Sequence, residues 1–205
     1  MRRVIVGGLL AAATILGLLA ASQLIDYGVL HLRVQALDSD YHSSVFGLAS
    51  LLAQAVVAAV MLWRGSRVER HRRAWYTLAA LIAGLIFLRT LMNFDAKTVA
   101  APLACVFWLL LWLTWRDARA ARRLVWAALV LMVTSLLLHQ VGLDADVLNY
   151  SNQSWAYQIT AVAKHGFELA GWILLATAVA AGVVGAPASR LRPARRKMLD
   201  AESVR

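Results

Sequence analysis

The chain has 205 residues, of which 61% are hydrophobic and 16% are charged, and its formal net charge is +10. Its mean hydropathy of +0.65 is too high for a soluble domain, because a core of this size cannot bury so many apolar side chains. Many of them must face lipid, which excludes a soluble enzyme, a disordered chain and a nucleic-acid-binding module. The single cysteine, Cys105, excludes intrachain disulfides and thiolate metal clusters.

Six uncharged stretches come close to the roughly 20 residues that a helix needs to cross a bilayer. None shows the alternating pattern of a barrel strand, so the sequence predicts an all-α fold, a polytopic transmembrane helix bundle. The predicted spans cover residues of about 4–25, 45–63, 74–93, 98–115, 124–141 and 162–185. We expect residues 1–189 to form a single six-helix transmembrane domain and residues 190–205 to form a basic cytoplasmic tail.

The first span has a second interpretation, since a basic start, an apolar run and the small residues Ala20, Ala21 and Ser22 also resemble a secretory signal. Its uncharged run of 22 residues is longer than a usual signal core. We therefore expect this segment to be retained as a span, and its removal would leave the remaining topology unchanged.

Arginine and lysine predict the orientation, because they resist translocation and accumulate on the cytoplasmic side. Seventeen of the 21 lie at the two ends of the chain and in the loops after the second and fourth spans, whereas the other flanks hold only Arg33, Arg89, Lys97 and Lys164. This asymmetry predicts that both termini are cytoplasmic, and it explains the positive charge without nucleic acid. The excess of arginine over lysine, with abundant alanine, indicates a bacterial protein of the plasma (cell inner) membrane.

Acidic residues and histidines gather in the outer flanks, which makes that side the expected place for chemistry. At about 100° per residue, one face of the sixth span carries polar groups within an arc of roughly 120°. These are Gln158, Lys164, His165, Glu168 and Trp172. The adjoining face carries Ile159, Val162, Leu169 and Ile173. We expect the polar face to point into the bundle and the apolar face to point to lipid.

Two polar pairs are predicted inside the membrane. Arg89 follows only fifteen uncharged residues, too few to span, so it is expected in the outer leaflet with a partner. We predict a structural ion pair between Arg89 and Glu168, with His139 near by. In the second span, Gln54 follows Ser50 by one turn, and a polar pair at that depth is typical of hydrogen bonds between helices.

A metal site is a second hypothesis for the outer residues. His165 and Glu168 are spaced i, i+3 on one helical face, and they could share a divalent ion such as zinc. His42, His139, Asp38 or Asp40 would complete the set of ligands. Zinc there would activate a bound water for hydrolysis, while haem held by two histidines is a further alternative. The chain has no strong signature such as His-Glu-x-x-His, so no cofactor is predicted from a motif.

Three segments resemble a group of small bacterial multi-spanning membrane proteins: Leu37-Asp38, the serine-rich entry into the second span over 43–52, and the Glu-x-x-Gly element that begins at Glu168. The resemblance implies a six-helix membrane protein and no particular activity.

Three functions are consistent with the sequence. The chain is an accessory or structural protein that acts through a membrane protein partner or as a homo-oligomer; a binder or transporter of ions or small molecules; or an outer-facing metal-dependent hydrolase acting on lipid or envelope substrates. The missing catalytic signatures favour the first, non-enzymatic role, and the shortage of polar residues at the midplane weighs against transport.

Overall fold

The computed structural model describes residues 1–25, 27–28, 45–68, 71–92, 96–115, 117–147 and 155–186, with the side chains of all but 46, 88–92, 96–103, 139–147 and 155–157. Within these ranges the fold is all-helical, as predicted, and contains no strands. The helices are α1 (Arg2–Ile25), α2 (Val45–Arg67), α3 (Arg72–Met92), α4 (Ala96–Thr114), α5 (Arg119–Val147) and α6 (Trp155–Val184).

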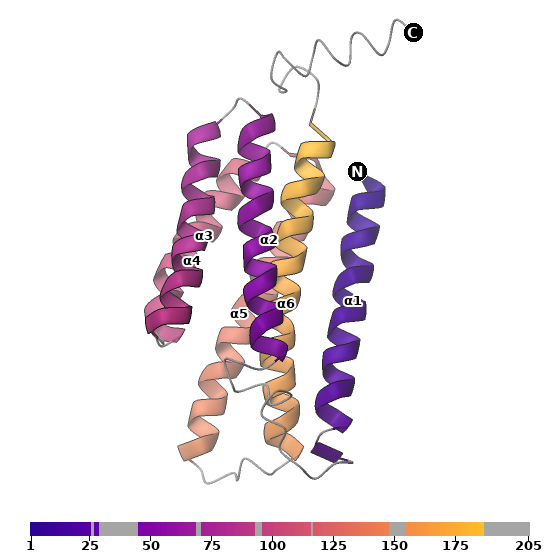
Figure 1. Cartoon of the computed structure of the whole chain (residues 1–205), viewed down its shortest axis with the longest axis vertical. Helices are drawn as coiled ribbons and strands as arrows, with labels where there is room; N and C mark the ends of the chain where they lie inside the picture. Colours follow the sequence, from indigo (N-terminus) through magenta and orange to yellow (C-terminus); the bar gives the residue numbers. More distant parts are fainter. Residues whose placement is uncertain are drawn as a thin grey trace, which may run out of the picture.

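The helices run along the long axis of the molecule, and each is antiparallel to the next in sequence (Figure 1). The start of α1 therefore lies beside the end of α6, where a Cβ built on Gly185 would be 2.9 Å from the Met1 sulfur. We call this end the arginine-rich end because nine arginines of the described helix termini gather there. They are Arg2, Arg3, Arg64, Arg67, Arg72, Arg73, Arg119, Arg122 and Arg123.

Each helix covers one of the apolar stretches, but α5 and α6 are longer than those stretches. α5 begins at Arg119 and ends at Val147, and α6 begins at Trp155, whereas hydropathy placed these spans at about 124–141 and 162–185. Charged and polar residues end an apolar run without ending a helix; arginine, at the start of α5, and glutamine, in the first turn of α6, are good helix formers. α6 has 30 residues, which corresponds to about 45 Å.

Four helices are long and apolar enough to cross a membrane, and they indicate a membrane location. These segments are Arg2–Ile25, Gly47–Arg67, Arg119–Leu138 and Gln158–Val184, and α4 adds a shorter apolar helix over Ala104–Thr114. Large apolar side chains on α1, including Leu10 and Leu18, are 63% and 67% exposed. Such exposure costs free energy in water but not in lipid.

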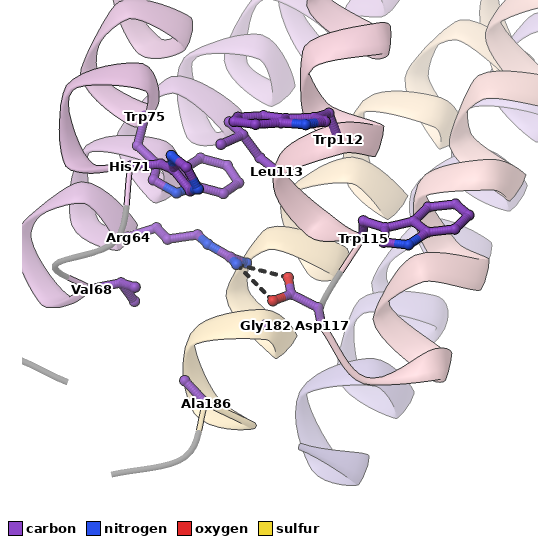
Figure 2. Close-up of a pocket in the computed structure, with 10 residues that line it drawn as sticks. All are labelled: Arg64, Val68, His71, Trp75, Trp112, Leu113, Trp115, Asp117, Gly182 and Ala186. Atoms are coloured by element: carbon purple, nitrogen blue, oxygen red, sulfur yellow. Dashed lines mark hydrogen bonds and ion pairs between the residues drawn. The ribbon is translucent and has the colours of Figure 1, made fainter. Parts of the chain in front are cut away.

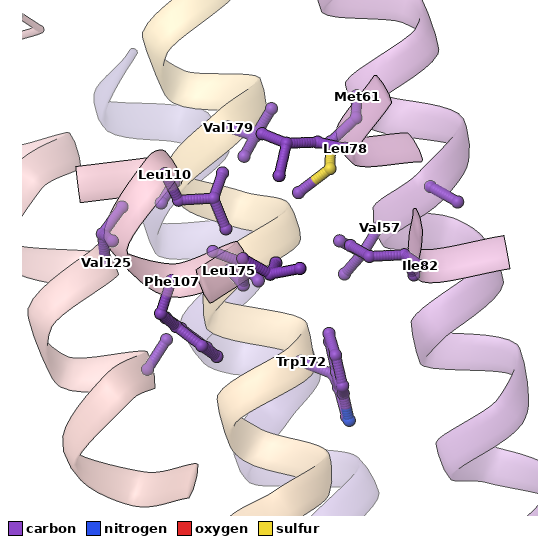
Figure 3. Close-up of a cluster of buried hydrophobic side chains, with 14 of the residues drawn as sticks. Val57, Met61, Leu78, Ile82, Phe107, Leu110, Val125, Trp172, Leu175 and Val179 are labelled. Atoms are coloured by element: carbon purple, nitrogen blue, oxygen red, sulfur yellow. The ribbon is translucent and has the colours of Figure 1, made fainter. Parts of the chain in front are cut away.

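The centre of the bundle is a hydrophobic cluster around α6, which packs against α5, α2 and α1. Leu175 and Val179 of α6 lie between Val57 of α2 and Leu110 of α4 (Figure 3). α5 and α6 approach closely at Gly171, where an added Cβ would be 2.6 Å from Met132 Cγ. Side chains thus fill the space between the two ends of the bundle.

The expectation of a lipid-facing apolar face on α6 is wrong at Leu169. Ile159 is 59% exposed, as expected, but Leu169 is only 2% exposed because it packs against Leu19 of α1. Ile173 packs against the same two leucines. α1 thus covers the face that was expected to meet lipid, so α6 is enclosed by neighbouring helices along much of its length.

Candidate functional site

A buried ion pair lies at the arginine-rich end of the bundle. Arg64, in the last turn of α2, donates from Nη2 to both carboxylate oxygens of Asp117, at 2.9 and 2.7 Å. The two side chains are 5% and 6% exposed. Arg64 Nη1 also donates to the Val179 carbonyl at 3.3 Å. Both carboxylate oxygens thus accept from one guanidinium nitrogen, and hydrogen bonds between charged groups are stronger than neutral ones. Together with the bond to Val179, they join α2, the turn between α4 and α5, and α6.

Trp75 and Gly182 fit closely around this pair. The guanidinium of Arg64 lies 4.2 Å from the centroid of the Trp75 ring, where the negative face of the indole attracts a cation. On the other side, a Cβ built on Gly182 would collide with Arg64 Nη1 and would lie 2.6 Å from an Asp117 oxygen. Only glycine leaves this space. We call Arg64, Asp117 and Trp75 the arginine clamp.

A cavity of about 280 Å³ opens beside the arginine clamp (Figure 2). Its walls include His71, Trp112 and Trp115. His71 has φ of 56°, a left-handed conformation that lets the chain reverse between α2 and α3, and histidine is enriched among the side chains that adopt it. The imidazole lies 4.7 Å from the Trp112 ring, centroid to centroid. The cavity therefore combines aromatic walls with a buried charge pair.

The opposite half of the bundle contains a line of polar contacts between α1, α2 and α6. Gln23 Nε2 donates to Gln158 Oε1 at 2.8 Å. Ten residues further along α6, Glu168 Oε1 accepts a hydrogen bond from Ser50 Oγ of α2 at 3.0 Å. Gln54 Nε2 donates to Ser50 Oγ at 3.3 Å. The expected hydrogen bond between helices is confirmed for Ser50, which reaches Glu168 of α6, whereas the bond of Gln54 to Ser50 lies within α2.

The structure describes only some of the predicted site residues. His165 Nδ1 and Glu168 Oε2 are 4.0 Å apart, with side chains 19% and 22% exposed. His42 lies outside the described residues, and the side chains of His139 and Arg89 lie outside them as well. Among the described side chains, no three histidine, cysteine or acidic residues are grouped to hold a metal. The ion pair between Arg89 and Glu168 and the shared metal site therefore stay predictions.

Sequence reasoning missed the arginine clamp because it treated Arg64 as one more cytoplasmic arginine. Such residues are expected in the headgroup region, yet Arg64 is 4% exposed. A signal was present, since Asp117 is an isolated acidic residue between two spans in a flank otherwise rich in arginine. An acidic residue among many cations is a candidate partner for one of them, but the sequence does not say which.

The structure also places Trp172 of the predicted polar face inside the bundle, at 4% exposed. Its indole nitrogen has no hydrogen-bond partner among the described residues.

Comparisons of the chain with protein-family models, with curated proteins and with solved structures gave no match. The function is therefore argued from the residues and their arrangement alone.

Proposed function

We propose that this chain is a plasma-membrane protein with six spans and with both termini in the cytoplasm. Four helices have the length and composition of spans, and α3 and α4 run antiparallel to their neighbours in the same bundle (Figure 1). A strong excess of arginine at one end of a helix bundle favours that end as the cytoplasmic one. The arginine-rich end, which holds the start of α1 and the end of α6, is therefore assigned to the cytoplasm.

We further propose that the chain is an accessory protein that binds another membrane protein through α4. The observation that carries this proposal is the position of Trp108, which is 77% exposed. It precedes Trp115 at the arginine-rich end by seven residues. Trp108 therefore lies about 10 Å deeper in the bilayer than Trp115. An indole prefers the interface, where its N–H finds an acceptor, and tryptophan is enriched where proteins bind one another. A partner helix over α4 would cover Trp108.

The packing of the bundle favours this role over transport. A transport path needs polar groups or broken helices near the midplane. Here the centre holds apolar side chains from α2, α3, α4 and α6, including Val57, Ile82, Leu110 and Leu175 (Figure 3). This cluster lies between the arginine clamp and the polar contacts of Glu168, and it fills the space through which cargo would pass.

A photo-crosslinking amino acid at position 108 tests the accessory role. The matched control is position 126, because Trp126 is an exposed tryptophan (49%) on the neighbouring helix α5. We expect a discrete protein adduct from position 108 in native membranes and none from position 126. An adduct at twice the mass of the chain would identify the partner as a second copy. Adducts with lipid alone from both positions would overturn the proposal.

Cysteine labelling tests the orientation. Cys105 is exposed and is first replaced by alanine, after which Asp38→Cys and Ser189→Cys are made separately. A membrane-impermeant maleimide should label Asp38→Cys in intact cells and Ser189→Cys only after the membrane is opened. Labelling of Ser189→Cys in intact cells would refute a cytoplasmic C-terminal tail.

A further inference from the structure

We propose that the cavity beside the arginine clamp binds the phosphate headgroup of a membrane phospholipid. This site goes beyond the accessory role. It rests on one part of the proposed function, the location of the arginine-rich end at a membrane surface, and it is independent of any partner protein.

The size of the cavity suits a group of several heavy atoms. Its volume of about 280 Å³ is several times the roughly 30 Å³ that one water molecule occupies in the liquid. Gly182 of α6 and Ala186, two residues after the end of that helix, form part of its lining, so small side chains keep it open. Asp117 does not repel an incoming phosphate strongly, because both of its oxygens accept hydrogen bonds from Arg64.

The walls place the cavity where a lipid headgroup would reach it. Trp112, in the last turn of α4, and Trp115, directly after that helix, line the cavity and are 57% and 62% exposed. Tryptophan rings at the end of a span lie at the level of the headgroups. A phospholipid beside α4 would therefore have its glycerol region against these indoles and its phosphate at the cavity (Figure 2).

The charge around the mouth of the cavity favours an anion. Arg122 lies over the Trp115 ring, 5.2 Å from its centroid, and donates to the Trp115 carbonyl at 3.2 Å. This contact fixes a second guanidinium next to a wall of the cavity, in addition to the guanidinium of Arg64, which Asp117 neutralises. Clusters of basic residues at the cytoplasmic face attract anionic headgroups. Arg119 and Arg123, which lie beside Arg122 at the start of α5, increase the positive electrostatic potential there.

The test measures lipid binding to the full chain, purified in detergent and stripped of lipid. The probes are phosphatidylglycerol, diacylglycerol with the same acyl chains, and inorganic phosphate, and the readout is the thermal unfolding midpoint at increasing probe concentration. Trp112→Leu and His71→Asn each replace one aromatic side chain that lines the cavity and leave Arg64 and Asp117 in place. Asparagine tolerates the left-handed backbone of His71. Trp126→Leu is the control, since Trp126 is exposed on α5 and does not line the cavity.

We expect phosphatidylglycerol to raise the midpoint of the wild type and of Trp126→Leu, with an apparent affinity lower by about tenfold in the two wall variants. Diacylglycerol and inorganic phosphate should have no effect. Equal responses of all four proteins would place the lipid elsewhere and overturn the site. A response to inorganic phosphate that matches the lipid would identify a free-phosphate site, and no response to any probe would remove the site altogether. Crosslinking at position 108 is unaffected by these outcomes, so the two proposals fail separately.

Discussion

Replacing Asp117 with asparagine measures how strongly the arginine clamp stabilises the bundle. The substitution keeps the shape of the side chain and removes its charge, so the guanidinium of Arg64, whose side chain is 5% exposed, loses its counter-charge. Breaking a buried ion pair in this way costs about 3–5 kcal/mol. In a chain of this size each kcal/mol lowers the unfolding midpoint by about 2–4 °C, so we expect a decrease of about 6–20 °C.

The assay is thermal unfolding of the detergent-purified protein, with Arg72→Met as the matched control. Arg72 is also an arginine at the arginine-rich end beside an aromatic ring, 5.2 Å from the centroid of Tyr76, but it is exposed. Its loss should cost no more than about 1 kcal/mol. The double variant Arg64→Met, Asp117→Asn should be more stable than Asp117→Asn alone, because no charge is left buried. A midpoint for Asp117→Asn that falls no further than that of Arg72→Met would refute a buried, energetically coupled pair.

Three further predictions concern both ends of the bundle. Gly182→Ala should lower the unfolding midpoint, because the new methyl group displaces the arginine clamp, and the loss should be smaller when Asp117→Asn is already present; fully additive losses would contradict this. Arg89→Glu and Glu168→Arg should each destabilise the protein, and no recovery in the double variant would disprove the predicted ion pair. Elemental analysis should find stoichiometric zinc in the wild type but not in the double variant His165→Ala, Glu168→Ala if the metal hypothesis is right, and the absence of metal from both would remove it.

The six helices could be predicted from the sequence because hydropathy and charge act in the same direction along the chain. Each apolar stretch ends near an arginine or an acidic residue, so the number of helices and their approximate positions followed. The helix ends of α5 and α6 could not be found in this way. Hydropathy detects where apolar side chains begin and end, whereas a helical backbone can continue beyond them, as α5 does through Gly142, Asp144 and Asp146.

The contacts between helices were only partly predictable. Polar residues in an apolar stretch must find partners, which is why Ser50 and Gln54 were expected to hydrogen-bond across a helix interface. Which residues meet lipid and which meet protein was not clear at Leu169, because leucine suits both environments and Leu169 lies at the edge of the polar face, about 20° from Gln158 around the helix. The pairing of Arg64 with Asp117 was equally hidden, since it depends on three chain segments meeting at one end of the bundle.

The position of α6 has a consequence for how the protein is made. α1 is the first of the six helices to leave the ribosome and α6 is the last, yet α1 packs chiefly on α6. During synthesis α1 is therefore present before its main neighbour has been made. The helices α2 and α3, in contrast, can already associate as a local pair. Assembly is completed only when α6 inserts and brings Leu169 against Leu19. A chain that ends before α6 would leave α1 without its main packing partner, and we expect such a chain to be degraded by membrane proteases.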